Sequence, residues 1–170
     1  MRVFTLPILV RFKHCDPAGI AFYPRLLEFA NDTVEAWFAE LGIGFPTLIG
    51  ERGIGLPTVG LNARFLKPCR HGELLESRLT PVKLGDRSLD LRIVLAGPEG
   101  DPRAGFDITL VCVERDAVAS RAWPQDVRAA QENGIRSIAV RTGVTPAGEL
   151  EACGPDCIYD DLTQFDLSII

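Results

Sequence analysis

The residues best suited to chemistry lie together near the N-terminus, in the stretch F-K-H-C-D-P-A-G-I-A-F-Y-P-R-L-L-E-F, residues 12–29. A helix is predicted to begin near Pro24, because proline is well tolerated in a first helical turn. Asp16 lies eight residues before that proline, whereas a carboxylate that caps a helix lies one residue before it. Capping therefore accounts poorly for Asp16.

The spacing favours an arrangement in which the carboxylate faces the start of the helix. Pro17 and Gly19 favour a tight loop, which would direct Asp16 toward a helix N-terminus near Phe22 or Tyr23. Unpaired backbone N–H groups and the helix dipole at such a terminus stabilise negative charge on a carbonyl oxygen. A carboxylate opposite such donors is the minimum equipment for transferring an acyl group to water. The stretch therefore predicts an acyl-transfer site.

The polar residues next to this acid each allow two interpretations. His14 would share a face with Asp16 if strand geometry continued, and its imidazole could then orient or tune the carboxylate. A histidine hydrogen-bonded only to backbone is the alternative. Asn31 and Asp32, on the predicted helix, could lie near an acyl pocket or on an exposed helix edge. Cys15 is expected to point away from Asp16 as a small buried apolar residue.

A first strand and a long helix must position these residues. Residues 3–12 are mostly β-branched and apolar, which predicts a strand. Residues 24–41 carry apolar side chains at three- and four-residue steps on more than one stripe, so we expect a largely enclosed helix that ends at Gly42. Its polar line, Glu28, Asp32 and Glu35, is expected to face solvent or an interface.

Four further runs read as strands: residues 58–67, 74–84, 88–96 and 106–114, separated by turn sequences. The run 88–96 shows the clearest alternation, with leucine or isoleucine at every second position from Leu89 to Leu95. One face of the sheet should therefore be buried and the other partly wet. The order of strand, buried helix and consecutive strands predicts an α+β fold, in which an antiparallel sheet curls around a long central helix. This is the hot-dog arrangement.

The C-terminal part of the chain gives weaker signals. A short helix is predicted over residues 124–133, with Gly134 ending it. We expect one domain over residues 1–134 and a C-terminal extension of uncertain order over residues 135–170. No internal repeat is visible.

Composition sets the outer bounds on function. The chain has 170 residues, of which 46% are hydrophobic, enough for one core without disulfides. The net charge of −5 argues against a nucleic-acid partner. The five cysteines are odd in number, no secretory signal is expected from the first residues, and no apolar run approaches the roughly 18 residues of a membrane helix. A cytoplasmic protein with no membrane partner is expected.

The motif C-D-P-A-G-I-A-F-Y-P, preceded by His14 and followed by N-D-T-V-E-A-W-F, resembles the signature of the 4-hydroxybenzoyl-CoA thioesterase family of the hot-dog superfamily. The similarity extends over roughly residues 3–130. It implies that Asp16 acts as nucleophile or general base on a thioester carbonyl, and that the backbone N–H of Tyr23 polarises that carbonyl. Many members have Gly-Asp before the cysteine where this chain has Lys13-His14, so the resemblance does not fix hydroxybenzoyl as the acyl group.

The same resemblance implies the ligand and the assembly. The substrate would be an acyl-CoA or aroyl-CoA, with coenzyme A as part of the substrate and no separate cofactor or metal. Lys83, Arg87 and Ser88, in the turn K-L-G-D-R-S, would contact the CoA of a neighbouring subunit. Hot-dog domains join sheets edge to edge, so a homodimer or homotetramer is expected.

Other classes of protein remain open to different degrees. An enoyl-thioester hydratase or dehydratase on the same fold is the closest alternative, and a non-catalytic acyl-thioester-binding protein is another. A Ser-His-Asp hydrolase has little support, because no Gly-x-Ser-x-Gly motif occurs. Cys153 and Cys157 could supply two thiolates to a metal, but no second pair lies nearby in the sequence.

Overall fold

The computed structural model describes residues 3–117, 119–132, 138–140 and 157–159. The chain forms two compact units, Met1–Gln131 and Glu132–Ile170. In the second unit, β9 (Ile138–Val140) and β10 (Cys157–Tyr159) pair in parallel. Gly134, Cys153 and most of the predicted extension over 135–170 lie outside the described residues.

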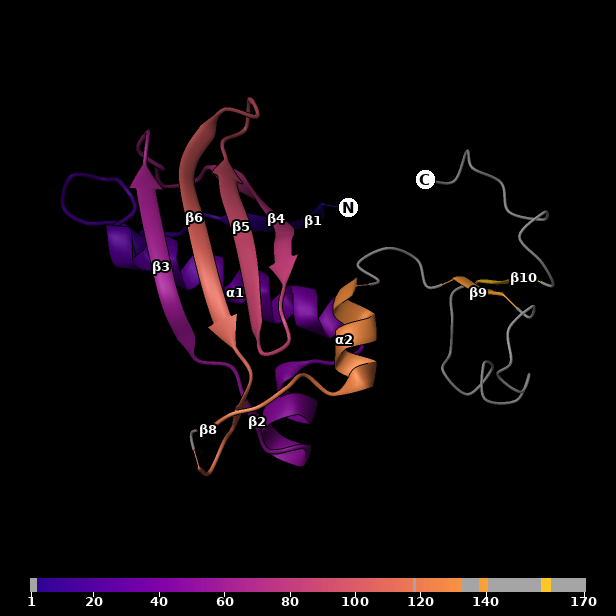
Figure 1. Ribbon diagram of the computed structural model, residues 1–170. Coiled ribbons are helices and arrows are strands. Elements are labelled where there is room, and N and C mark those ends of the chain that lie inside the picture. Colours follow the sequence, from indigo (N-terminus) through magenta and orange to yellow (C-terminus); the bar gives the residue numbers. More distant parts are fainter. Residues whose placement is uncertain (1–2, 118, 133–137, 141–156, 160–170) are drawn as a thin grey trace. The chain divides into compact units, whose positions relative to one another are not determined.

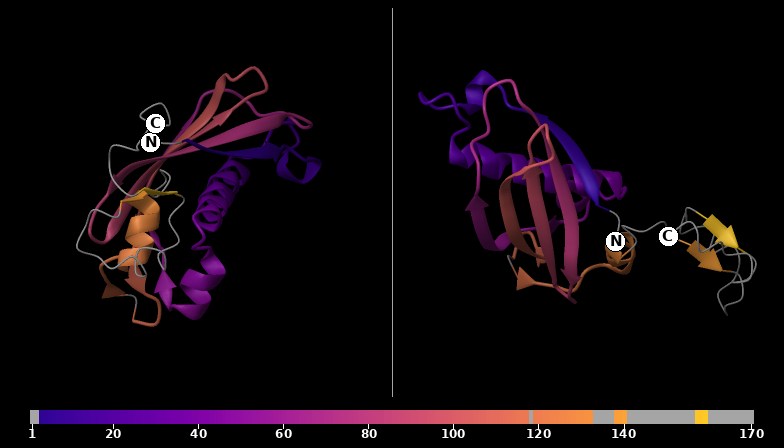
Figure 2. Two further views of the ribbon diagram at one scale, coloured as in Figure 1. Left: turned by 90° about the vertical axis from the view of Figure 1, so that its right-hand side faces the viewer. Right: turned by 90° about the horizontal axis from the view of Figure 1, so that it is seen from above.

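The first unit is built on a five-stranded sheet with the order β1-β4-β5-β6-β3, and every neighbouring pair is antiparallel (Figure 1). The long helix α1 (Tyr23–Glu40) packs against one face of this curved sheet (Figure 2). The predicted α+β plan, a sheet curling around a long helix, is confirmed. The strands are β1 (Phe4–Leu9), β3 (Thr58–Phe65), β4 (Leu74–Leu84), β5 (Ser88–Ala96) and β6 (Pro102–Val111).

The alternation of buried and exposed side chains along β5 explains which face of the sheet packs against α1. Leu89, Leu91, Ile93 and Leu95 are each at most 1% exposed, and the residues between them lie on the outer face, where Arg92 is exposed. Because strand side chains alternate between faces, the leucines and isoleucine meet α1. The helix buries a broad stripe in return: Leu26, Phe29, Ala30, Thr33, Val34, Trp37 and Phe38.

One polar contact lies inside this apolar interface. The Thr33 hydroxyl donates to the Phe29 carbonyl at 2.7 Å and lies 2.7 Å from the Ser77 hydroxyl of β4. Thr33 has a single hydroxyl hydrogen, so Ser77 must donate to Thr33. Both side chains are fully buried. The pair therefore fixes the position of α1 over β4 with both donors satisfied.

Three predicted strands had wrong bounds, and the smallest difference is that β3 ends at Phe65 rather than residue 67. The first strand ends at Leu9 rather than residue 12, because residues Phe12–His14 form a short 3-10 helix, η1. The last predicted strand begins earlier, at Pro102, because backbone pairing with β5 needs no apolar side chain there. It also divides: β7 (Val113–Glu114) leaves the main sheet and joins a small sheet with β2 (Ile54–Gly55) and β8 (Ala119–Ser120).

The remaining described elements complete the first unit. A π-type turn, η2 (Pro46–Glu51), follows α1, and Gly42 adopts a φ of +74°, the left-handed conformation that ends a helix. The predicted C-terminal helix corresponds to α2 (Gln125–Glu132). Among the described residues, no helix is long and apolar enough to cross a membrane.

Candidate active site

The segment between β1 and α1 folds as a small hairpin that carries Asp16. The backbone N–H of Asp16 donates to the carbonyl of Ile20, and the N–H of Gly19 donates to the carbonyl of Asp16, each at 2.9 Å. Gly19 has a φ of +75°, a conformation that glycine adopts without strain. Cys15 pairs with Ala21 across the hairpin. The expected tight loop is therefore present.

Asp16 uses only half of its carboxylate within this hairpin. Its Oδ1 accepts a hydrogen bond from the backbone N–H of Ala18 at 2.8 Å, which fixes the side chain in an Asx turn. The other oxygen, Oδ2, accepts no hydrogen bond from any residue that the structure describes. The side chain is half-buried. One carboxylate oxygen is thus available for chemistry while the other holds the geometry.

The start of α1 leaves one backbone donor unused. Phe22 precedes the helix in an extended conformation without a side-chain cap, and Pro24 follows with no N–H to offer. The N–H of Arg25 donates to the carbonyl of Phe22 at 2.8 Å. Within the described part of the chain, the N–H of Tyr23 has no acceptor. This is the N–H that the resemblance assigns to carbonyl polarisation.

The carboxylate and the free N–H belong to one continuous, hydrogen-bonded segment of the chain. The N–H of Phe22 donates to the carbonyl of His14 at 2.9 Å, next to the Cys15–Ala21 pair. Asp16 lies opposite Ile20 in this hairpin, and Tyr23 follows Ile20 by three residues, as the first residue of α1.

His14 lies in a different environment from the one expected. Strand geometry does not continue to His14, because η1 turns the chain, and the structure gives no hydrogen bond between its imidazole and Asp16. Instead, Nδ1 accepts the backbone N–H of Arg11 at 3.0 Å, and the ring lies edge-on to Phe29 at 4.8 Å. With Nδ1 as acceptor, the proton of the neutral ring is on Nε2.

The surroundings of His14 favour its neutral form. Its pKa is lowered, first by burial and then by the neighbouring cations Lys13, Arg25 and Arg11, with Glu28 opposing them. An imidazolium would lose hydration and face three positive charges. His14 thus contributes a packed ring and a carbonyl that fixes Phe22, and its predicted catalytic role stays untested.

A hollow of about 110 Å³ lies between α1 and the β3 side of the sheet. It begins one helical turn after Tyr23, about 6 Å along the axis, and continues past Asn31. Asn31 and Thr58 are the polar residues in its lining. Asp32 is exposed and does not line it. The remaining walls are Leu27, Ala30, Val34, Phe45, Leu56, Leu61, Ile108 and Leu110.

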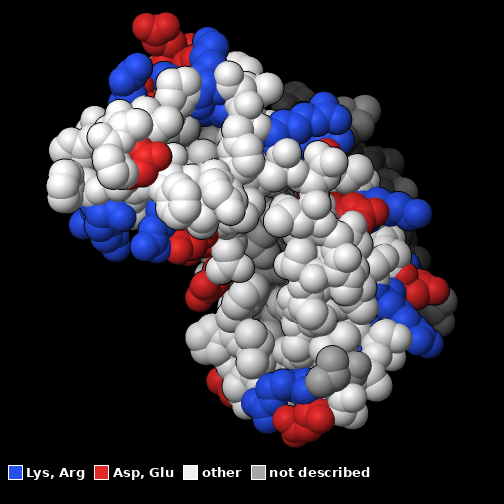
Figure 3. All heavy atoms as spheres, turned by 90° about the vertical axis from the view of Figure 1, so that its left-hand side faces the viewer, with Lys and Arg blue, Asp and Glu red and all other residues white. Residues whose placement is uncertain are grey.

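The hollow opens at the edge of the molecule where β3 ends the sheet. Figure 3 shows this face: uncharged atoms cover most of it, with a depression between two masses and charged groups gathered mainly at the rim. Val59, Leu61 and Phe65 of β3 are 63%, 52% and 48% exposed. Sequence reasoning did not find the walls from β3 and β6, because an apolar strand residue gives no local signal of which cavity it lines.

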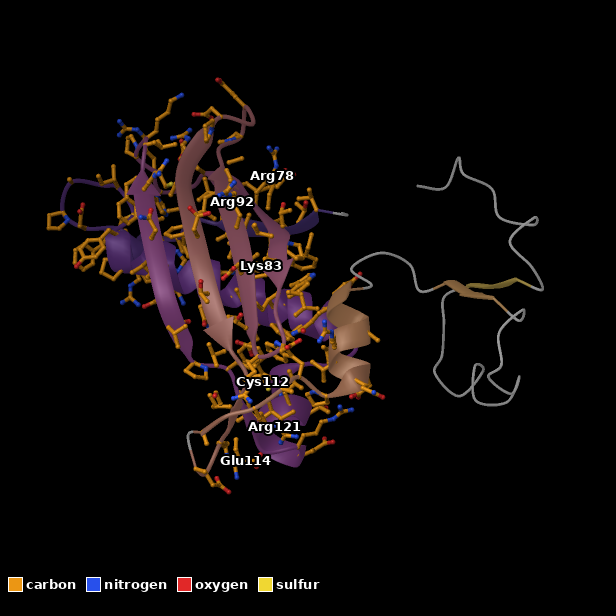
Figure 4. All side chains as sticks on the ribbon, in the orientation of Figure 1. Arg78, Lys83, Arg92, Cys112, Glu114 and Arg121 are labelled. Atoms are coloured by element: carbon orange, nitrogen blue, oxygen red, sulfur yellow. The ribbon has the colours of Figure 1, made fainter. Side chains whose placement is uncertain are left out.

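The predicted CoA contacts lie elsewhere in the same chain. Lys83 is exposed near the end of β4, and Arg87 donates to the Ser120 hydroxyl at 3.2 Å. The carbonyl of Ser88 accepts the indole N–H of Trp123 at 3.4 Å. Leu74, at the other end of β4, pairs with Leu9, so about 30 Å of strand separates the turn from the Asp16 end. One chain therefore does not bring these residues to Asp16; Figure 4 labels Lys83 on β4.

An antiparallel sheet wrapped around one long helix defines the hot-dog class of folds. A family model described as the thioesterase-like superfamily matches residues 10–131, and the chain belongs to this superfamily. The prediction of a thioester hydrolase is confirmed at this level. A second model, described as HAD-hydrolase-like, matches residues 122–165, about a quarter of the chain.

Named relatives support the same assignment. The chain is 28% identical over 105 residues to a 1,4-dihydroxy-2-naphthoyl-CoA hydrolase of Thermosynechococcus vestitus, covering 62% of this chain and 72% of that protein. Another hydrolase of that name, from Synechococcus elongatus, is 32% identical, but the match spans only 57% of its length.

Solved structures show the same fold. A 1,4-dihydroxy-2-naphthoyl-CoA thioesterase from Synechocystis superposes with a TM-score of 0.72 at 20% identity, covering 78% of this chain and 97% of the other. A gentisyl-coenzyme A thioesterase superposes with a TM-score of 0.66 at 26% identity, covering 75% and 99%.

Proposed function

We propose that this protein hydrolyses an aroyl-CoA or acyl-CoA thioester to the free acid and CoA. The observation that carries the proposal is that one short segment, residues 16–23, holds two unused groups: Asp16 Oδ2 and the N–H of Tyr23. A thioester carbonyl placed between them would meet an attacking group on one side and a hydrogen-bond donor on the other. One such donor is worth about 2.7–4 kcal/mol at the transition state.

The chemistry follows either of two routes. Asp16 attacks the thioester carbon and forms an anhydride that water then hydrolyses, or it removes a proton from a water that attacks the thioester carbon directly. In both routes the carbon–sulfur bond breaks, negative charge collects on the carbonyl oxygen near Tyr23 N–H, and the CoA thiolate leaves and takes up a proton. Water supplies the oxygen that the product acid gains.

An aromatic acyl group suits the hollow along α1. A cavity of about 150 Å³ lined by apolar side chains accepts benzene, and the hollow here has about 110 Å³ before any contribution from a second chain. Asn31 and Thr58 could hydrogen-bond a ring hydroxyl. The names of the relatives, which include naphthoyl-CoA and gentisyl-CoA enzymes, support an aroyl substrate. The narrower 4-hydroxybenzoyl assignment stays a prediction.

A second copy of this chain is proposed to cover the β3 edge. Among the strands that the structure describes, β3 bonds only to β6, so its other edge presents unpaired backbone groups beside the exposed Val59 and Phe65. Pairing two such edges would satisfy those groups. It would also bring a second chain, with its own Lys83, Arg87 and Ser88, to the mouth of the hollow. Light scattering should give a homodimer or homotetramer, and Val59→Lys should shift it toward monomer; a wild-type monomer would contradict the proposal.

A panel of CoA thioesters tests the activity. Free thiol released from 1,4-dihydroxy-2-naphthoyl-CoA, 4-hydroxybenzoyl-CoA and aliphatic acyl-CoA identifies hydrolysis and ranks the acyl groups. Conversion of an enoyl-CoA without thiol release would instead identify a hydratase. Binding of all thioesters with no turnover would identify a non-catalytic acyl-thioester-binding protein.

A further inference from the structure

Arg103 of β6 lies at the centre of a largely enclosed polar cluster, away from the residues that line the hollow. Its side chain is only 14% exposed. Nη2 donates to Glu73 Oε1 at 3.2 Å, Nε lies 3.1 Å from Asp101 Oδ2, and Nη1 donates to the carbonyl of Pro68. A guanidinium with its donors in a fixed fork holds such partners in one relative arrangement.

These contacts fix the segment of residues 66–73, which we call the supporting segment. The N–H groups of Leu66 and Lys67 donate to the carbonyl of Arg103 at 2.8 and 3.1 Å. Glu73 connects Arg103 to the backbone of the segment, because its other oxygen, Oε2, accepts the backbone N–H of Arg70 at 2.7 Å. The guanidinium and the backbone of Arg103 therefore hold both ends of the supporting segment.

The supporting segment in turn pairs with the hairpin that carries Asp16. The N–H of Ala21 donates to the carbonyl of Cys69 at 2.8 Å, and Ile20 forms a bridge with Arg70. The carbonyl of Ile20 accepts the N–H of Asp16. Continuous contacts thus connect the guanidinium of Arg103 to the backbone of Asp16 without any contact between the two residues.

We propose that Arg103 is a positioning residue, which holds the supporting segment and thereby sets the position of the Asp16 carboxylate relative to Tyr23 N–H. The inference rests on the proposed function of Asp16. A shift of about 1 Å in a reacting group can cost about 100-fold in rate. Removing the guanidinium should therefore lower kcat more than it raises KM, because no substrate contact is lost.

Gly97 offers an independent way to move the same guanidinium. A Cβ at this position would lie 2.5 Å from Asp101 Oδ1 and 2.8 Å from Arg103 Nη2. Gly97→Ala therefore displaces the cluster while leaving all of its side chains present. Its effect should resemble that of Arg103→Met in kind, and it also serves if Arg103→Met fails to fold.

The matched control is Arg92→Met. Arg92 pairs with Asp107 at 2.7 Å across β5 and β6 on the outer face of the sheet (Figure 4), with no contact to the supporting segment. Arg92→Met removes an arginine–carboxylate ion pair from the same sheet, whereas the partners of Arg103, Glu73 and Asp101, lie just before β4 and β6. Thermal unfolding of each variant establishes that it is folded before its activity is compared.

Two measurements test the inference. Amide hydrogen exchange at Asp16 and Ala21 should be at least tenfold faster in Arg103→Met and Gly97→Ala than in Arg92→Met. With the best thioester of the panel, kcat should fall about 10- to 100-fold with KM within threefold, and Arg103→Lys should recover part of the loss. Faster amide exchange in Arg103→Met and Gly97→Ala supports the positioning role even if Asp16→Asn proves active. In that case only the proposed function of Asp16 is refuted. Exchange or kcat equal to that of Arg92→Met in the folded variants overturns the inference.

Discussion

Replacing Asp16 by asparagine separates the chemistry of the carboxylate from its structural part. Asparagine has the same shape, and its side-chain oxygen can still accept the Ala18 N–H that Asp16 Oδ1 accepts at 2.8 Å. The hairpin should therefore keep its conformation. What disappears is the negatively charged Oδ2, which no described residue engages and which the proposed reaction needs as nucleophile or base.

The expected loss follows from the role of that oxygen. A positioned general base contributes about 10²–10⁴-fold to the rate, which corresponds to about 3–5.5 kcal/mol of barrier. Asp16→Asn should lower kcat by at least this range while the melting temperature stays near the wild-type value. Asp16→Ala should lose the Ala18 hydrogen bond as well, at a further cost of about 1 kcal/mol in unfolding free energy.

Thiol release from an aroyl-CoA measures kcat, and binding of CoA alone, expected to change less than a few-fold, reports whether the site is intact. Asp32→Asn is the matched control, because Asp32 is exposed on α1 and does not line the hollow. Turnover by Asp16→Asn within tenfold of wild type would refute the assignment of the carboxylate to the reaction.

Three further predictions concern the hollow, the core and the pH dependence. Ala30→Leu adds three carbons inside the hollow and should raise KM for aroyl-CoA with little change in melting temperature. Ala39→Leu, on the exposed side of α1, should change neither KM nor the melting temperature. Thr33→Val leaves the buried Ser77 hydroxyl without its acceptor and should lower the free energy of unfolding, measured in urea, by about 1–3 kcal/mol. The double variant Thr33→Val with Ser77→Ala should recover part of that loss, and no recovery would contradict the hydrogen bond between Thr33 and Ser77. Because the folded pKa of His14 is lowered, the unfolded chain binds the proton more readily, so stability should fall as pH drops below 6.5. His14→Gln should show a smaller fall between pH 7.5 and 5; equal falls would count against the burial of the ring.

Much of the fold could be predicted because its signals are local. The alternation of Leu89, Leu91, Ile93 and Leu95 predicts a half-buried strand, and β5 has the bounds that the pattern indicates. The apolar stripes after Pro24 predict α1 within one residue at each end. The wrong boundary before Asp16 also has a local cause, since His14 accepts the Arg11 N–H and turns the chain into η1, which strand propensity does not register.

The sequence by itself determined the order of the elements, the tight loop that carries Asp16 and the helix start, because hydrophobic periodicity, Pro24 and Gly19 act over a few residues. Only the tertiary structure decided what surrounds them. The walls of the hollow come from α1, β3 and β6, and the support of the Asp16 hairpin comes from Arg103, more than 80 residues away in the chain. Such contacts depend on how strands pair and which faces meet, and no short stretch of sequence encodes that.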